Sequence, residues 1–120
     1  MHELGIANSI LEATLSEMEL YVTARPIQVT VRIGVLAAVD PDALQFCFDA
    51  LTRDTEFSAL KLKIEICPRK HRCPACGAEF TVENYDFRCA SCGEANTEFI
   101  SGDQLELVSL EMEGYESSAA

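Results

Sequence analysis

The chain has 120 residues, of which 48% are apolar, and a formal net charge of −11 at pH 7. This length suits one small domain, or a small domain that carries an inserted module, with a limited hydrophobic core. The negative charge disfavours nucleic acid as a partner, because the phosphate backbone would repel the protein. No apolar run approaches the ~20 residues that cross a bilayer, so we expect no membrane association.

The amino-terminal segment does not have the pattern of a secretory signal. It contains Glu3, Glu12, Glu17 and Glu19 and lacks the basic segment with which such signals open. We therefore expect a cytoplasmic protein. In a reducing cytosol the six cysteines favour metal binding over disulfides.

Two segments have the sequence pattern of helices. Apolar residues recur with a helical period from Leu4 onward, which predicts a helix over about residues 3–23. Asp40 and Pro41 favour the start of a second helix, because aspartate caps the free amides and proline fits the first helical position. We expect this second helix to end near residue 53.

Three further segments have the pattern of strands. Apolar and polar residues alternate over residues 27–36 and 60–66, which predicts strands with one buried face. A last strand is expected over residues 104–113. A right-handed crossover through the second helix would make the first two strands parallel and the sheet mixed. The predicted fold is α+β, with a small three-stranded mixed sheet and two helices.

Two Cys-x-x-Cys pairs, each followed by glycine, precede the last predicted strand: Cys73 with Cys76, and Cys89 with Cys92. The two-residue gap turns both thiolates of a pair toward one centre, and the glycine lets the turn continue. Two such pairs indicate a closed tetrahedral Zn²⁺ site of the structural kind. A pair of disulfides or a redox-active Cys-x-x-Cys motif is the alternative interpretation.

These cysteines predict a zinc-ribbon-like module, inserted into the sheet domain and built from two short hairpins or from turns, with little regular structure. We place the module at residues 67–98 and the other domain at residues 1–66 and 99–116. Three other cysteine and histidine residues are interpreted without a metal role, with coordination of either metal by His71 as the alternative. Cys47 is assigned to the apolar face of the second helix and Cys67 to a strand end, and His71 is assigned to a solvated basic patch with its neighbours Arg69, Lys70 and Arg72.

The amino terminus Met1-His2-Glu3 can form a metal chelate. The α-amine, the amide nitrogen of His2 and its imidazole can occupy three positions of one square through fused rings. Glu3 can supply the fourth donor through its amide or carboxylate, as can a residue brought in by the fold. Nitrogen donors in a square suit Ni²⁺ or Cu²⁺ better than Zn²⁺. The alternative is a solvent-exposed terminal histidine that binds nothing.

Taken together, four stretches resemble the HypA/HybF family of nickel metallochaperones. They are residues 1–4, residues 44–49, the two cysteine pairs and residues 107–112. This resemblance runs from end to end of the chain. Members of the family serve the maturation of NiFe hydrogenase and, in some organisms, of urease. The second cysteine pair departs from the family pattern, because Ala90 and Glu94 stand where many members have proline and serine.

The resemblance implies that Met1, through its amine, and His2 hold Ni²⁺, with Glu3 contributing through its backbone or carboxylate. It also implies Zn²⁺ at the four cysteines. Asp40 is a further nickel candidate, because family members can have an acid near the start of the second helix, and a capping role is compatible with this. The implied protein is a nickel carrier and not an enzyme. Its implied partners are a HypB-type GTPase and the hydrogenase large subunit, and we expect a monomer or weak homodimer.

A zinc-ribbon adaptor that binds a protein complex or nucleic acid is the alternative function. The basic residues 69–72 would be its contact surface. The net charge of −11 argues against nucleic acid, and an adaptor has no need of Met-His-Glu at its terminus. A zinc hydrolase is excluded, because four cysteines leave no coordination position for water.

Overall fold

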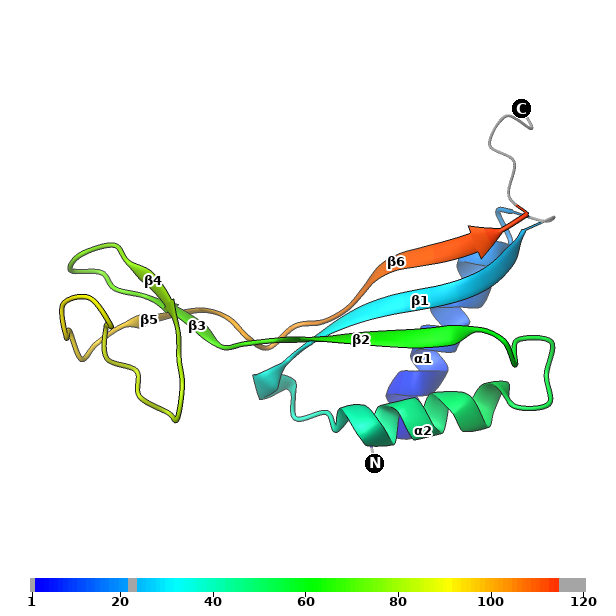
Figure 1. Ribbon diagram of the computed structural model, residues 1–120, viewed down its shortest axis with the longest axis horizontal. Coiled ribbons are helices and arrows are strands. Elements are labelled where there is room, and N and C mark those ends of the chain that lie inside the picture. Colours follow the sequence, from blue (N-terminus) through cyan, green and yellow to red (C-terminus); the bar gives the residue numbers. More distant parts are fainter. Residues whose placement is uncertain (1, 22–23, 115–120) are drawn as a thin grey trace. The chain divides into compact units, whose positions relative to one another are not determined.

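The computed structural model describes residues 2–21 and 24–114, which form two sheets and two α-helices (Figure 1). Residues 1, 22–23 and 115–120 lie outside the described part, as does the side chain of His2. In chain order the elements are α1 (His2–Met18), β1 (Arg25–Gly34), the 3₁₀ helix η1 (Val35–Ala37), α2 (Pro41–Thr52), β2 (Lys61–Cys67), β3 (Lys70–Arg72), β4 (Glu79–Thr81), β5 (Glu98–Ser101) and β6 (Leu105–Glu113). None of the described helices is long and apolar enough to span a bilayer.

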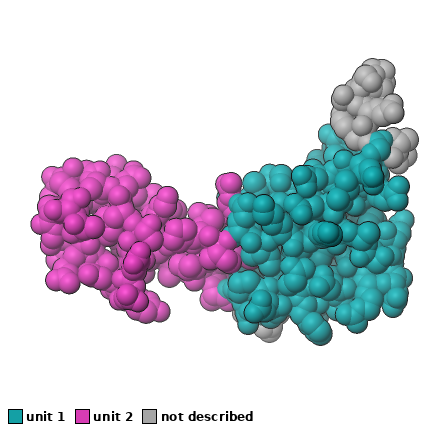
Figure 2. Space-filling model, in the orientation of Figure 1, with its two compact units in different colours: residues 1–31, 39–65, 106–120 teal, residues 32–38, 66–105 magenta. Residues whose placement is uncertain are grey.

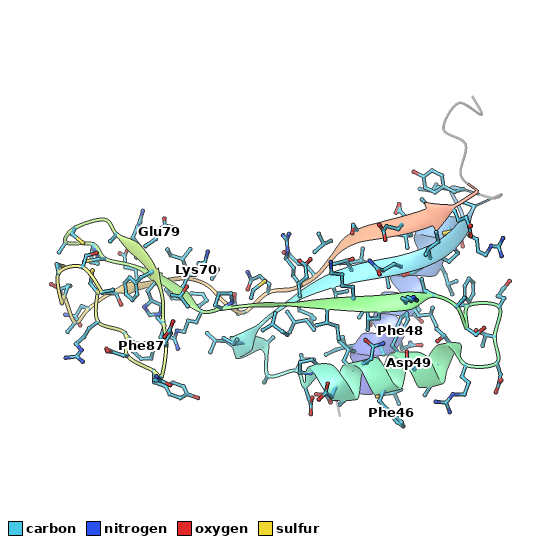
Figure 3. All side chains as sticks on the ribbon, viewed as in Figure 1. Phe46, Phe48, Asp49, Lys70, Glu79 and Phe87 are labelled. Atoms are coloured by element: carbon cyan, nitrogen blue, oxygen red, sulfur yellow. The ribbon has the colours of Figure 1, made fainter. Side chains whose placement is uncertain are left out.

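The first sheet has the strand order β2-β1-β6, and α1 and α2 pack beside each other against it. In Figure 1 the arrows of β1 and β2 run in the same direction and that of β6 runs in the opposite direction, so the sheet is mixed. Val29, Val31 and Ile33 of β1 are buried, as the predicted alternation requires. Ile27 of the same phase is nevertheless exposed and Thr30 of the other phase is buried, and the strand ends at Gly34, before the predicted residue 36, because Val35–Ala37 turn into η1. From α2, Phe48 points toward the sheet and Phe46 points away from it (Figure 3). The predicted α+β fold with two helices is confirmed.

Helix α1 ends at Met18, earlier than the apolar period predicts. The amide of Leu20 donates to the carbonyl of Glu17, and that of Tyr21 donates to the carbonyl of Met18. These i→i+3 bonds close a tight turn in place of another helical turn. The rest of the predicted segment, residues 22–23, lies outside the described part.

The second sheet has the order β4-β3-β5 and is antiparallel, with His71 opposite Phe80 on one side and Phe99 on the other. One of the short hairpins expected in the module is present as β3 and β4, whereas the pairing of β5 with β3 is not part of that expectation. Three-residue strands are too short to show an alternating pattern in the sequence, and long-range pairing forms them.

The chain divides into two compact units, residues 1–31, 39–65 and 106–120, and residues 32–38 and 66–105 (Figure 2). The second unit is larger than the predicted module 67–98, because β5 pairs with β3 and because residues 32–38 join it. Gly34 donates its amide to the carbonyl of Gln104, and Leu36 donates to that of Gly102. A Cβ on Gly34 would lie 2.1 Å from the backbone of Gly102, so this approach requires glycine.

Candidate metal centres

The two cysteine pairs lie on turns of the same construction. In the first, Gly77 donates its amide to the carbonyl of Cys73 at 2.7 Å and has φ +80°. In the second, Gly93 donates to the carbonyl of Cys89 at 2.9 Å and has φ +81°. Glycine is the residue that adopts this left-handed backbone without strain. The repeated Cys-x-x-Cys-Gly sequence thus forms the same turn twice.

The four cysteine sulfurs of these turns gather at one point, with all of them within 4.8 Å of one another. The Sγ atoms of Cys73 and Cys92 are 3.5 Å apart, and those of Cys76 and Cys89 are 3.6 Å apart. Tetrahedral zinc with four thiolates separates the sulfurs by about 3.8 Å, so the cluster fits one such ion. The cysteines form no disulfide. Sequence spacing therefore predicts correctly which four residues come together.

Backbone amides favour the ionised form of the Cys89 thiol, which is the form that binds a cation. The amide of Cys92 donates to this sulfur at 3.4 Å and that of Ser91 at 3.3 Å. These hydrogen bonds lower the pKa of Cys89 to about 6, and the bond from Cys92 has the largest effect. Four thiolates this close repel one another, so a cation is needed before all of them ionise together. The four sulfurs can therefore hold a metal cation, which binds as the thiols lose their protons.

His71 lies in the core of the second unit, with only 4% of its surface exposed. The Nε of Arg69 donates to its Nε2 at 2.9 Å, so the ring proton is on Nδ1, which lies 2.9 Å from the hydroxyl of Thr97. Thr97 in turn donates to the carbonyl of Phe87, whose ring stacks on the imidazole at 5.4 Å. Burial, followed by the charge of Arg69, lowers the pKa of His71 and keeps it neutral. The interpretation of His71 as part of a solvated patch is wrong.

At the start of α1, Glu3 contacts the start of α2. Its Oε2 accepts a hydrogen bond from the amide of Asp40 at 3.0 Å. This bond is the largest of the effects that lower the pKa of Glu3 to about 2. The carboxylate is therefore ionised at neutral pH. Two predicted nickel residues that are 37 positions apart in the sequence are thus neighbours. Met1 lies outside the described part, so its role and that of the His2 imidazole stay predictions.

Asp40 is the N-cap of α2, as the sequence predicts. Its Oδ1 accepts from the amide of Asp42 at 3.0 Å and from that of Ala43 at 3.4 Å, and Pro41 occupies the first helical position. The cap uses only one carboxylate oxygen in these two bonds. A metal role through the other oxygen is compatible with this geometry.

Comparison with known proteins gives one consistent family. The family model described as "Hydrogenase/urease nickel incorporation, metallochaperone, hypA" matches residues 1–112. The chain is 39% identical over 113 residues to hydrogenase maturation factor HypA of Geobacter metallireducens, covering 94% of this chain and 100% of the relative. It is 40% identical over 114 residues to the factor of the same name from Geotalea uraniireducens, with the same coverage.

Two solved structures share the fold. One is the solution structure of the Ni metallochaperone HypA from Helicobacter pylori, with a TM-score of 0.59, 22% identity and coverage of 92% of this chain and 96% of that one. The other is a solution structure of HypA protein, with a TM-score of 0.69, 22% identity and coverage of 95% and 98%. At this identity the two structures support the fold alone.

Proposed function

This chain belongs to the HypA family of hydrogenase maturation factors, and from that premise we propose that it carries Ni²⁺ to a NiFe hydrogenase and acts as a carrier, not as an enzyme. Its proposed receiver is the hydrogenase large subunit, with urease as a second receiver within the range of the family description. The sequence contains no Gly-x-x-x-x-Gly-Lys-Ser/Thr phosphate-binding loop. Energy or gating must then come from a partner, which we propose is a HypB-type GTPase.

The observation that carries this proposal is the contact between Glu3 and Asp40. It brings the start of α1, where His2 is the first helical residue, beside the cap of α2. We propose that the amine of Met1 and the amide and imidazole nitrogens of His2 hold the ion, with Glu3 and Asp40 contributing to the site. Amine and imidazole must be deprotonated to bind, so nickel should be released as pH falls.

The four cysteines would hold Zn²⁺, which supplies structural cross-linking when bound and has no position left for water or substrate. The two turns orient the sulfurs, and the amides of Ser91 and Cys92 stabilise the negative charge on Cys89. A closed sulfur site of this kind keeps its ion while a terminal nitrogen site exchanges. We therefore propose that zinc stabilises the fold and that nickel is the ion that the protein transports.

Replacing His2 by alanine tests the function directly. We expect the dissociation constant for nickel to rise at least about 100-fold, because losing even an outer partner of a metal costs 10- to 100-fold. Zinc should stay at one per chain. The second histidine of the sequence, His71, is buried and cannot replace the lost ligand. Nickel titration with metal analysis measures both, and hydrogenase activity in cells lacking their own family member tests delivery. An unchanged nickel affinity would contradict the terminal site.

Two substitutions at Asp40 separate its cap from a metal role. Asp40→Asn keeps an oxygen acceptor at the cap, so we expect the free energy of unfolding to change by no more than about 0.5 kcal/mol, whereas Asp40→Ala should lose about 1 kcal/mol. Removing the negative charge should weaken nickel binding several-fold in both variants. If Asp40→Asn binds nickel like the parent protein, Asp40 serves the helix alone.

A further inference from the structure

The loop between β4 and Cys89 contains a strained two-residue turn. Glu83 and Asp86 form an antiparallel bridge, and the amide of Asp86 donates to the carbonyl of Glu83 at 3.0 Å. Between them Asn84 and Tyr85 have φ of 55° and 62°. Turns with two left-handed residues favour Asn-Gly, because a Cβ at the second position crowds the backbone. Tyrosine is an unfavourable residue there.

Packing does not compensate this strain. The side chain of Tyr85 is 84% exposed and makes no hydrogen bond or ring contact with another described residue. Glycine at this position would relieve the backbone and would lose no buried surface. A strained, exposed aromatic residue is better explained by binding than by folding, since tyrosine presents a large, amphipathic contact area.

Tyr85 borders a concavity of about 300 Å³, which we name the Tyr85 pocket. Its lining, all from the second unit, is Val35, Leu36, Arg69, Val82, Asn84 and Tyr85. Val35 and Leu36 of η1 are 54% and 43% exposed, which is high for branched aliphatic side chains that lie together. The pocket thus has aliphatic and aromatic walls open to solvent.

Arg69 adds a fixed positive group to this lining. Its guanidinium lies 4.3 Å from the ring centre of Phe87, and its Nε donates to His71. Its terminal nitrogens have no hydrogen-bond partner among the residues that the structure describes. A guanidinium oriented by stacking and with free donors binds carboxylates well, because its parallel N–H groups match two oxygens.

The charge distribution also favours an acidic ligand at this unit. Nearly all of the net charge of −11 comes from the first unit. In the second unit the charged residues nearly balance, with positive residues Arg32, Arg69, Lys70, Arg72 and Arg88 and negative residues Glu79, Glu83, Asp86, Glu94, Glu98 and Asp103. Zn²⁺ held by the four thiolates would add a charge of −2 to this unit, and an acidic segment is still repelled less here than by the first unit.

We propose that the Tyr85 pocket binds an extended peptide segment of a partner protein in which an apolar side chain is next to a carboxylate. The apolar side chain fills the space between Tyr85 and η1, and the carboxylate pairs with the terminal nitrogens of Arg69. This docking site goes beyond the proposed nickel site and does not depend on nickel being carried.

Nuclear magnetic resonance titration of the zinc-loaded, isotope-labelled full chain tests the proposal. The probe is the peptide acetyl-Gly-Leu-Asp-Leu-Asp-Gly-amide, and the matched control peptide has asparagine at both aspartates. We expect the acidic peptide to shift the backbone amides of Val35, Leu36 and Val82 at concentrations up to about 5 mM. The asparagine peptide should bind at least about tenfold more weakly.

Tyr85→Gly separates binding from folding. This variant should bind the acidic peptide at least about tenfold more weakly, as expected for an aromatic anchor, while its melting temperature is no lower than that of the parent protein. The matched control is Phe46→Ala, which removes another exposed aromatic, from α2 in the first unit (Figure 3), and should leave peptide binding unchanged.

Several outcomes would overturn the proposal. They are an absence of shifts, shifts confined to the first unit, equal binding of both peptides, and unchanged binding by Tyr85→Gly. Shifts of the pocket amides on concentrating the protein without peptide would identify a second copy of the chain as the occupant and would also overturn it. None of these peptide titrations involves nickel, so a negative result would contradict the docking site without contradicting the proposed nickel function.

Discussion

Adding the two residues Gly-Ser before Met1 is expected to abolish tight nickel binding and to leave one zinc per chain. The extension keeps every side chain of the sequence and converts only the α-amine of Met1 into an amide. That amine, with a pKa of about 8, is a good nitrogen donor near neutral pH, whereas an amide must lose a far less acidic proton first. We expect the dissociation constant for nickel to rise at least about 100-fold.

The length of the extension matters for this experiment. One added residue would make His2 the third residue of the chain, and an amine, two amides and an imidazole would then form a complete nitrogen square, which suits Ni²⁺. With two added residues, three amide nitrogens separate the new terminal amine from the His2 imidazole, so the amine and the imidazole no longer fit into one square around the ion. Equal nickel affinity of the native and the Gly-Ser form, measured by titration with metal analysis, would place the ion elsewhere in the protein.

The features that the sequence predicts well are those set by local spacing. Cys73 and Cys76 meet because two residues and a glycine determine the turn between them, and the second pair repeats that turn. Asp40 caps α2 because its side chain reaches amides two and three residues ahead. Val29, Val31 and Ile33 of β1 are buried at alternate positions, as the sequence pattern predicts, although Thr30 between them is buried as well.

The features that the sequence does not reveal depend on tertiary contacts. His71 is flanked by Arg69, Lys70 and Arg72, and this charge suggests solvent, yet the rings of Phe87 and Phe99 bury it after long-range pairing. Its hydrogen bond with Thr97 spans 26 positions. No local pattern marks these partners. The contact between Glu3 and Asp40 is likewise invisible locally, and only the family resemblance suggests that these residues share a site.

Replacing Cys73 by serine is expected to remove zinc and to unfold the second unit while the first unit stays folded. Structural zinc supplies about 10–16 kcal/mol in small modules, which is as large as the whole stability of a typical domain. The second unit has only short strands, and its core is centred on His71. Its amides at His71 and Arg72 should therefore lose protection from hydrogen exchange, whereas those at Val29 and Val31 of β1 should keep it.

Cys47→Ser and Cys67→Ser are the matched controls, because both thiols are partly buried and lie outside the sulfur cluster. Each should keep one zinc per chain and full protection of β3. Zinc analysis combined with residue-resolved exchange distinguishes the possible roles of the metal. If Cys73→Ser loses zinc and β3 nevertheless stays protected, the stacked rings and hydrogen bonds around His71 suffice to fold the unit. Zinc would then have to be assigned a role other than holding this fold together.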